Sequence, residues 1–329
     1  MVLVTGGTGL VGAHLLIHLL ENEESVRAIY RKTENIEKTK SLFLLYKKEF
    51  LFEKIEWIQA DIIDVPSLEI AFENIEYVYH SAALISFDPK DENLLRKINI
   101  EGTANIVNFC IAKAVKKLCF VSSTTALGDL APNETIITEE TLWDPEKPHS
   151  DYAISKYGAE MEIWRGHQEG LNVVIANPGV IFGPGFMKQG SGMLFTKVAN
   201  GLSFYTKGST GFIAVTDVVK ILFQLMKSDI NNERFTLISQ NIIYRDVLNS
   251  IADALNVKKP SYFASPLLIS ISWRIDWFLS TFFGRKRKLD RATASNSNSQ
   301  KLLSNEKIKT ALGIDFLDVH HYIKEISRL

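Results

Sequence analysis

Residues 1–12 read MVLVTGGTGLVG and place three glycines between an apolar run and a helical pattern. MVLVTG predicts a strand, and LVGAHLLIHLLEN (10–22) predicts a helix. Gly6, Gly9 and Gly12 allow a tight bend, close approach of backbone N–H groups to a pyrophosphate, and close packing of helix and sheet. The strand–turn–helix context favours a nucleotide site, and a purely structural turn is the alternative.

Further strands alternate with helical patterns along the first half of the chain. The predicted strands are SVRAIYR (25–31), IEWIQADI (55–62), IEYVYHSAA (75–83) and KKLCFVSST (116–124). This alternation predicts an α/β, Rossmann-type, doubly wound parallel sheet. The pattern loosens after about residue 178, which predicts a smaller, mostly helical C-terminal substrate lobe. We expect residues 1–177 to form the nucleotide-binding domain with 211–240 returning to it, and 178–210 and 241–329 to form the lobe.

Bulk composition excludes several classes of function. The 329 residues carry a net charge of −1, so no global field attracts nucleic acid. Cys110 and Cys119 lie in apolar patterns and are expected to be buried free thiols, which favours a reducing, cytoplasmic setting. We expect no signal peptide and no membrane span. His14 and His18 share a helix face but have no accompanying ligand cluster, so we predict no metal site.

The second predicted strand ends in Tyr30, Arg31 and Lys32, without a carboxylate. Many NAD sites place an acid here to hold the ribose 2′-hydroxyl. Two cations suit a 2′-phosphate instead, because they make charge-assisted hydrogen bonds to it. The sequence therefore predicts NADP in preference to NAD, and a solvated basic strand end is the alternative.

The segment SDYAISKYGAE (150–160) places Tyr152 and Lys156 on one face of a predicted helix. Taken alone, such a pair is usually an exposed helix feature. Beside a nucleotide site, it has the chemistry of a proton donor and the cation that activates it.

Seven motifs in order resemble the extended short-chain dehydrogenase/reductase (NAD-dependent epimerase/dehydratase) family, and within it the dihydroflavonol reductase and 3β-hydroxysteroid dehydrogenase branch. The motifs are TGGTGLVG (5–12), ADIID (60–64), VYHSAA (78–83), NIEGTANIV (99–107), VSSTTALG (121–128), YAISK (152–156) and NPGVIFGPG (177–185). One departure is Asn177-Pro178, where the family often has Arg-Pro, so a cofactor or structural contact is expected to differ.

The resemblance implies roles for individual residues. Tyr152 would be the general acid or base, Lys156 would lower its pKa and hold the nicotinamide ribose, and Ser123 would bond the substrate carbonyl. Ser122 and Thr124 are the alternatives one residue away. Asn99 would act structurally or in a proton relay. Cofactor contacts are implied for Gly6, Thr8, Gly9, Leu10, Val11, Gly12, Arg31, Lys32, Asp61, Ile62, Ser81, Ala82, Ala83, Tyr152, Lys156, Pro178 and Val180.

The predicted function is an NADP-dependent oxidoreductase that interconverts a carbonyl and a secondary alcohol on a small, apolar substrate. Phe87, Phe186 and Met187 suggest apolar pocket walls. The alternatives are a nucleotide-sugar epimerase or dehydratase with tightly bound NAD, and a non-catalytic NADP-sensing protein.

Residues 266–283 form an amphipathic pattern that is followed by GRKRK (284–288). We expect a helix that covers the substrate pocket, with membrane contact through 266–288 as the less favoured interpretation. A homodimer is implied by the resemblance only.

Overall fold

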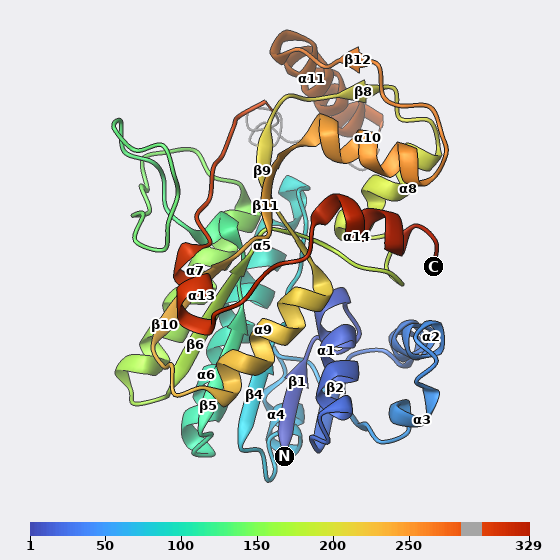
Figure 1. Cartoon of the computed structure of the whole chain (residues 1–329). Coiled ribbons are helices and arrows are strands. Elements are labelled where there is room, and N and C mark those ends of the chain that lie inside the picture. Colours follow the sequence, from blue (N-terminus) through green and yellow to red (C-terminus); the bar gives the residue numbers. More distant parts are fainter. Residues whose placement is uncertain (284–297) are drawn as a thin grey trace.

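A computed structural model describes residues 1–283 and 298–329, and its centre is a sheet of seven parallel strands in the order β10-β6-β5-β4-β1-β2-β3 (Figure 1). The strands are β1 (Val2–Thr5), β2 (Val26–Tyr30), β3 (Glu56–Gln59), β4 (Tyr77–His80), β5 (Lys117–Val121), β6 (Val173–Pro178) and β10 (Glu233–Leu237). The predicted doubly wound parallel sheet is therefore confirmed. Both thiols, Cys110 and Cys119, are buried as predicted.

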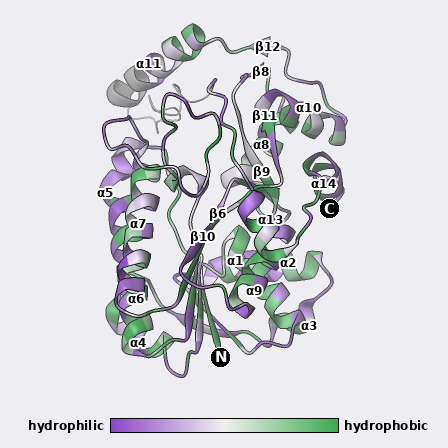
Figure 2. Cartoon of the chain, turned by 60° about the vertical axis from the view of Figure 1, so that its left-hand side comes forward, coloured by the Kyte–Doolittle hydropathy of each residue, from purple (hydrophilic) through white to green (hydrophobic). Residues whose placement is uncertain are grey.

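Helices cover both faces of the sheet. Val2 and Val4 of β1 face one apolar core and Leu3 faces the other, because successive strand residues point to opposite faces. The first core is covered by α1 (Leu10–Glu21), α2 (Ile36–Leu45), α3 (Glu49–Phe52), α9 (Val215–Lys227) and α13 (Glu306–Leu312). The second is covered by α4 (Val65–Ala71), α6 (Gly102–Ala112) and α7 (Asp151–Gln168). Hydrophobic residues gather where these helices meet the sheet (Figure 2).

A smaller lobe lies beyond the carboxyl ends of the strands (Figure 1). Its strands are β7 (Val180–Phe182), β8 (Phe204–Tyr205), β9 (Ser209–Ala214), β11 (Gln240–Ile243) and β12 (Tyr262–Phe263). Its helices are α8 (Met193–Ala199), α10 (Tyr244–Ala254), α11 (Pro266–Phe283) and α14 (Val319–Ile326). The lobe is mixed rather than mostly helical, because β9 pairs with both β7 and β11. Of the segment 211–240, β10 lies in the main sheet, whereas β9 belongs to the small one.

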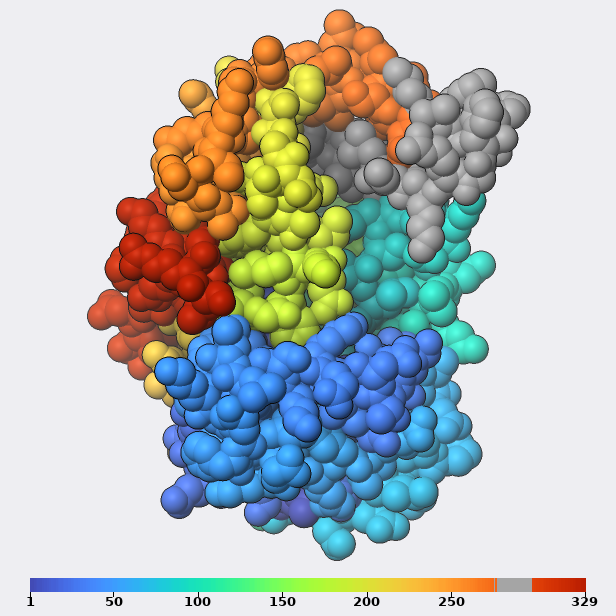
Figure 3. Space-filling model, turned by 90° about the vertical axis from the view of Figure 1, so that its right-hand side faces the viewer, coloured from blue at the N-terminus to red at the C-terminus, as the bar shows by residue number. Residues whose placement is uncertain are grey.

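The strand order reverses between β1 and β4, where the crossovers lead to opposite sides of the sheet. Such a switch point opens a crevice at the carboxyl ends of the strands, where ligands bind in open α/β sheets. The lobe faces this edge. Figure 3 shows its yellow-green segment near residue 200 resting on the blue N-terminal part of the chain.

The edge strand β10 is sealed by the segment that precedes α7. The Glu139 carboxylate accepts a hydrogen bond from the backbone N–H of Thr236 at 2.6 Å. The Arg234 side chain in turn donates to the carbonyl of Glu139 at 2.9 Å. The first of these bonds satisfies a backbone N–H on the edge strand β10, and the second holds the covering segment in place.

Helix α11 presents apolar residues outwards. Ile269 is buried against Ala264, whereas Leu267 and Ile271 are 72% and 48% exposed. The basic run at 284–288 lies outside the described residues. Among the described residues, no helix is both long and apolar enough to cross a bilayer.

Lys117 fastens α9 to the sheet. It begins β5 and is buried, and its ammonium donates hydrogen bonds to the carbonyls of Leu225, Ser228 and Ile230 at 2.7, 3.0 and 2.6 Å. The last carbonyls of a helix have no partner within the helix, so Lys117 caps α9 through Leu225 and also holds the chain that follows the helix through Ser228 and Ile230.

We expect Lys117→Met to lower the free energy of unfolding by about 2 kcal/mol, because buried carbonyls lose a charged donor. Urea denaturation would show this as a lower midpoint with an unchanged slope. The control is Lys116→Met, which removes an exposed pair with Glu76 and should change the midpoint much less. Equal shifts in the two variants would contradict the capping role.

Candidate active site

The glycine turn follows β1 at the switch point. Gly6 has a φ of +74°, and a Cβ there would lie 2.7 Å from the Ala82 nitrogen. A Cβ at Gly12 would lie 2.1 Å from the Gly6 carbonyl oxygen. Both positions therefore require glycine. At Gly9 a Cβ would meet only the Gly6 oxygen at 3.4 Å, an ordinary contact, so the protein's own packing permits a side chain there.

The start of α1 provides an anion site. Gly9 is its N-cap and supplies no side-chain hydrogen bond, so the first backbone N–H groups of the helix point out of the turn. Thr8, Leu10 and Val11 are partly exposed around it. Free N–H groups and the positive end of the helix dipole favour a phosphate. The open space at Gly9 and this donor set fit the pyrophosphate of a dinucleotide.

Arg31 and Lys32 lie just beyond the end of β2, which is the strand next to β1. Both side chains are exposed, and Lys32 lies 3.9 Å from the exposed carboxylate of Glu34. The carboxyl ends of adjacent parallel strands meet at one edge, so these cations flank the glycine turn. They are free to approach a phosphate on an adenosine ribose.

The remaining residues predicted at the cofactor occupy the ends of the other strands. Asp61, after β3, accepts a hydrogen bond from the Ile63 N–H at 3.2 Å and is partly exposed. Ile62 is buried and packs against Gly102, where a Cβ would lie 2.6 Å from its Cδ1, so it contributes packing. Pro178 ends β6 and is buried, and Val180 begins β7 half-buried.

The segment after β4 is tied to β1. Ser81 Oγ donates to the Thr5 carbonyl at 2.7 Å, and the Ala82 N–H donates to Thr5 Oγ1 at 3.2 Å. Ala83, which follows, is exposed. His80, at the end of β4, is buried between the hydroxyls of Thr5 and Thr103. Burial lowers the pKa of this imidazole to about 3, so it is a neutral structural group.

Tyr152 and Ser123 come together at the carboxyl end of β5. The Ser123 side chain acts on the Tyr152 hydroxyl in the direction that lowers its pKa, and the Phe87 ring meets the Tyr152 ring edge-on with centroids 5.9 Å apart. Ser123 caps a short helical turn and accepts hydrogen bonds from the Thr125 N–H and hydroxyl. Burial raises the pKa of Tyr152 to about 12, and the Ser123 side chain opposes that rise.

Lys156 lies one helical turn after Tyr152 and is 2% exposed. Its ammonium donates to the Val121 carbonyl at 2.9 Å and lies 4.3 Å from the centroid of Phe120. Burial lowers the pKa of this ammonium to about 7, and the charge of Glu160 opposes that fall. The protein's own groups thus give Tyr152 a raised pKa, in contrast to the lowering expected from Lys156.

Asn99 clamps the site from the side. It lies in a π-helical segment (Arg96–Glu101) that follows α5 (Glu92–Leu95) and leads into α6. Its amide bonds both the N–H and the carbonyl of Leu84, and donates to Ser155 Oγ at 2.9 Å. These contacts join the segment after β4 to α7, which is a structural role.

Glu160 and Arg234, which were given no site role, form a largely buried polar cluster with Ser122 and Asn177 behind Tyr152 and Lys156. The sequence spacing could have identified Glu160, because it follows Tyr152 by eight residues and Lys156 by four and so lies on the same helix face. Arg234 lies on β10, far away in sequence, and no local pattern marks it.

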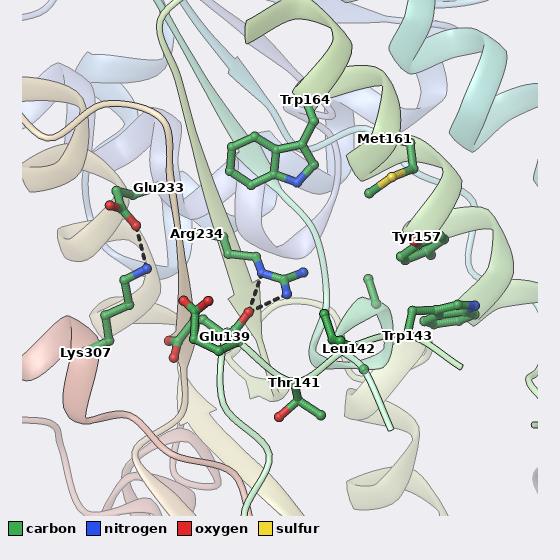
Figure 4. A pocket seen from close by; sticks show the side chains of 13 residues that line it. Glu139, Thr141, Leu142, Trp143, Tyr157, Met161, Trp164, Glu233, Arg234 and Lys307 are labelled. Atoms are coloured by element: carbon green, nitrogen blue, oxygen red, sulfur yellow. Dashed lines mark hydrogen bonds and ion pairs between the residues drawn. The ribbon is translucent and has the colours of Figure 1, made fainter. Parts of the chain in front are cut away.

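A pocket of about 340 Å³ lies on the other side of α7 (Figure 4). Tyr157, Met161 and Trp164 of α7 line it, with Trp143 stacked on Tyr157 at 4.4 Å between centroids. Arg234 borders the pocket from β10, bonded to Glu139. Among the described residues, no cluster of His, Cys, Asp or Glu could hold a metal ion.

Residues 2–237 match the NAD dependent epimerase/dehydratase family. Sterol demethylase protein B of Methylococcus capsulatus is 27% identical over 93% of this chain and 88% of its own length. Anthocyanidin reductase of Arabidopsis thaliana is 28% identical over 79% and 80%. The UDP-glucose 4-epimerase structure from Thermotoga maritima covers 99% of this chain and 97% of its own, with a TM-score of 0.77 and 20% identity, which is a likeness of fold.

Gly9→Ala separates nucleotide binding from stability. Gly9 has an extended backbone that alanine adopts, so the thermal midpoint should stay within about 2 °C of wild type. The added methyl group would occupy the approach to the helix N-terminus, and the Kd for NADPH should rise about tenfold or more in a fluorescence titration.

The matched control is Gly170→Ala. Gly170 has a φ of +96° with no atom within 4 Å of an added Cβ, so that variant should lose stability and keep its affinity. Wild-type affinity in Gly9→Ala would place the pyrophosphate elsewhere.

Proposed function

Because the chain belongs to the NAD-dependent epimerase/dehydratase family and is an oxidoreductase of the extended short-chain type, we propose that it interconverts a carbonyl and a secondary alcohol on a small, apolar substrate with NADP. The observation that carries this proposal is that Tyr152, Ser123 and the buried Lys156 come together at the edge of the sheet where the glycine turn lies. When bound, the nicotinamide cofactor supplies or accepts the hydride.

The chain's own residues would manage the proton and the developing charge. The Tyr152 hydroxyl would donate its proton to the carbonyl oxygen in reduction and recover it in oxidation. The Ser123 hydroxyl would donate a hydrogen bond to the same oxygen and stabilise its negative charge. When Lys156 is protonated, its positive charge would favour the tyrosinate form of Tyr152, because a nearby cation lowers the pKa of a phenol.

Apolar side chains at the mouth support an apolar substrate. Phe87 is 49% exposed with its ring against Tyr152, and Ile85 is 57% exposed. Both follow β4 in a segment held by Asn99. Relatives named as reductases, such as anthocyanidin reductase, support a reductase. Phe186, expected in the pocket wall, is buried beside His14 in the first core, and Met187 packs against the core of the lobe.

We propose a homodimer in the cytoplasm. We also propose a division close to residues 1–177 with 211–240 and 178–210 with 241–329, except that β9 lies in the small sheet of the lobe and α13 covers the first core of the main sheet. The two buried free thiols suit a reducing compartment. The dimer rests on family resemblance.

Tyr152→Phe should reduce turnover at least about a hundredfold, because the carbonyl oxygen loses its proton donor. The assay is NADPH oxidation with an aryl or alicyclic ketone that the wild type reduces, chosen from a panel. The Kd for NADPH should stay within about twofold. The control is Tyr157→Phe on the same helix, whose ring stacks on Trp143 and whose turnover should be unchanged.

Retained turnover in Tyr152→Phe would remove the tyrosine from the mechanism. The reductase proposal itself would fail if the purified protein released NAD only on denaturation and did not exchange it with NADPH. Such a tightly held cofactor is expected of internal recycling, as in the epimerase alternative.

Arg31 and Lys32 should set the cofactor preference. We expect the wild type to have a higher kcat/KM with NADPH than with NADH. The double change Arg31→Ala and Lys32→Ala should lower that ratio about tenfold or more, as charge-assisted bonds to a 2′-phosphate are lost. Lys38→Ala is the control, since Lys38 lies on the nearby helix α2 and its ammonium bonds Asn35 just before that helix. A wild type that prefers NADH would refute the assignment.

A further inference from the structure

Glu160 is a fully buried carboxylate on the inner face of α7. It follows Lys156 by one helical turn and has no exposed surface. Glutamate is almost never fully buried unless its charge is paired, because removing a carboxylate from water is costly. Its neighbours therefore show what the side chain is for.

The carboxylate is surrounded by donors. Its Oε1 accepts hydrogen bonds from Ser122 Oγ and from Asn177 Nδ2, both at 2.5 Å. Its Oε2 lies 3.4 Å from Nη1 of Arg234, whose side chain is 19% exposed. Arg234 is held in place by its bonds to the Glu139 carbonyl.

These bonds reach the backbone of Ser123. Asn177 Nδ2 also donates to the Ser123 carbonyl at 3.0 Å, and Ser122 precedes Ser123 in the chain. One carboxylate thus anchors two groups that fix the turn presenting the Ser123 hydroxyl to Tyr152. Asn177, which stands where the family often has arginine, supplies one of the two anchors.

The same carboxylate lies between two cations. The charged and titratable groups around the Lys156–Glu160 pair come from α7, β4 and β10: Tyr152, His80 and Arg234, with Glu139 bonded to Arg234 on its far side. Of these, His80 is neutral at pH 7 because burial lowers its pKa to about 3, and Tyr152 is neutral because a phenol titrates well above pH 7.

Burial raises the pKa of Glu160, whereas the bonds from Ser122 and Asn177 and the charges of Arg234 and Lys156 lower it. A neutral Glu160 would take away the anion whose charge acts on both Lys156 and Arg234. This arrangement favours the anion.

We propose that Glu160 is a positioning residue of the active site, which stabilises the ammonium form of Lys156 and holds the Ser122–Ser123 turn against Tyr152. Its catalytic consequence rests on the proposed function. The electrostatic part concerns groups of the chain alone and can be measured without substrate.

The test is Glu160→Gln, which keeps the shape and an acceptor oxygen but removes the charge. In protein labelled with ¹³C at lysine Cε, the resonance of Lys156 is identified by its absence in Lys156→Met. In the wild type it should titrate with a pKa of about 7. In Glu160→Gln that midpoint should fall by about one to three pH units, because loss of a nearby anion disfavours the ammonium.

The matched control is Glu162→Gln on the same helix. Glu162 pairs with Arg165 at 2.8 Å, and its loss should leave the Lys156 midpoint in place. An unchanged midpoint in folded Glu160→Gln would overturn the proposal. So would an equal shift in both variants.

Glu160→Asp tests the anchoring, and it stands alone if Glu160→Gln does not fold. Aspartate keeps the negative charge, so the titration midpoint of Lys156 should stay within about half a pH unit. Its side chain is shorter by one methylene group, so the bonds to Ser122 and Asn177 should weaken and kcat should fall about tenfold. The KM for NADPH should not change. Full kcat in Glu160→Asp would overturn the anchoring role.

Failure of the proposed function would look different. A wild type that turns over no carbonyl substrate would remove that function, yet the Lys156 titration in Glu160→Gln would still move if Glu160 is its counter-ion.

Discussion

The close approach of the glycine turn to the end of β4 is the constraint on which the rest of the site depends. Gly6 and Gly12 lie where a single Cβ would overlap backbone atoms, and Thr5 bonds the segment that follows β4. This contact fixes the spacing of β1 and β4 at the switch point. The N-terminus of α1 and the Ser123 turn are thereby set at fixed positions along the same edge of the sheet.

Helix α7 organises the chemistry by its period. Tyr152, Lys156 and Glu160 follow one another at intervals of four residues, so they form one inward stripe along the helix. The stripe runs from a hydroxyl at the mouth, through a buried ammonium, to a fully buried carboxylate. Burial disfavours the charged form of each group, and the neighbours in the stripe offset part of that cost. The outward face of the same helix instead carries Tyr157, Met161 and Trp164.

The sheet and the glycine turn could be predicted because local sequence determines them: strand-forming runs, helical spacing and glycine positions all fall within a few residues. The Ser123–Tyr152 pair was expected only through resemblance to a family. The partners of Glu160 could not be predicted, because Asn177 and Arg234 reach it from two other strands. The position of Phe186 could not be predicted for a different reason. An apolar side chain suits a pocket wall and a core equally well, and Phe186 lies in the first core because residues far from it in the sequence pack against it.

The bond from Glu139 to the Thr236 N–H has a consequence for solubility as well as for geometry. An edge strand with free N–H and carbonyl groups is a template on which a second chain can add its own strand, and this is a common route to aggregation. Here a carboxylate occupies one of those groups, and Arg234 pins the sealing segment to the same strand. Arg234, which contacts Glu160 inside the protein, thus also helps to prevent other chains from pairing with the edge strand β10.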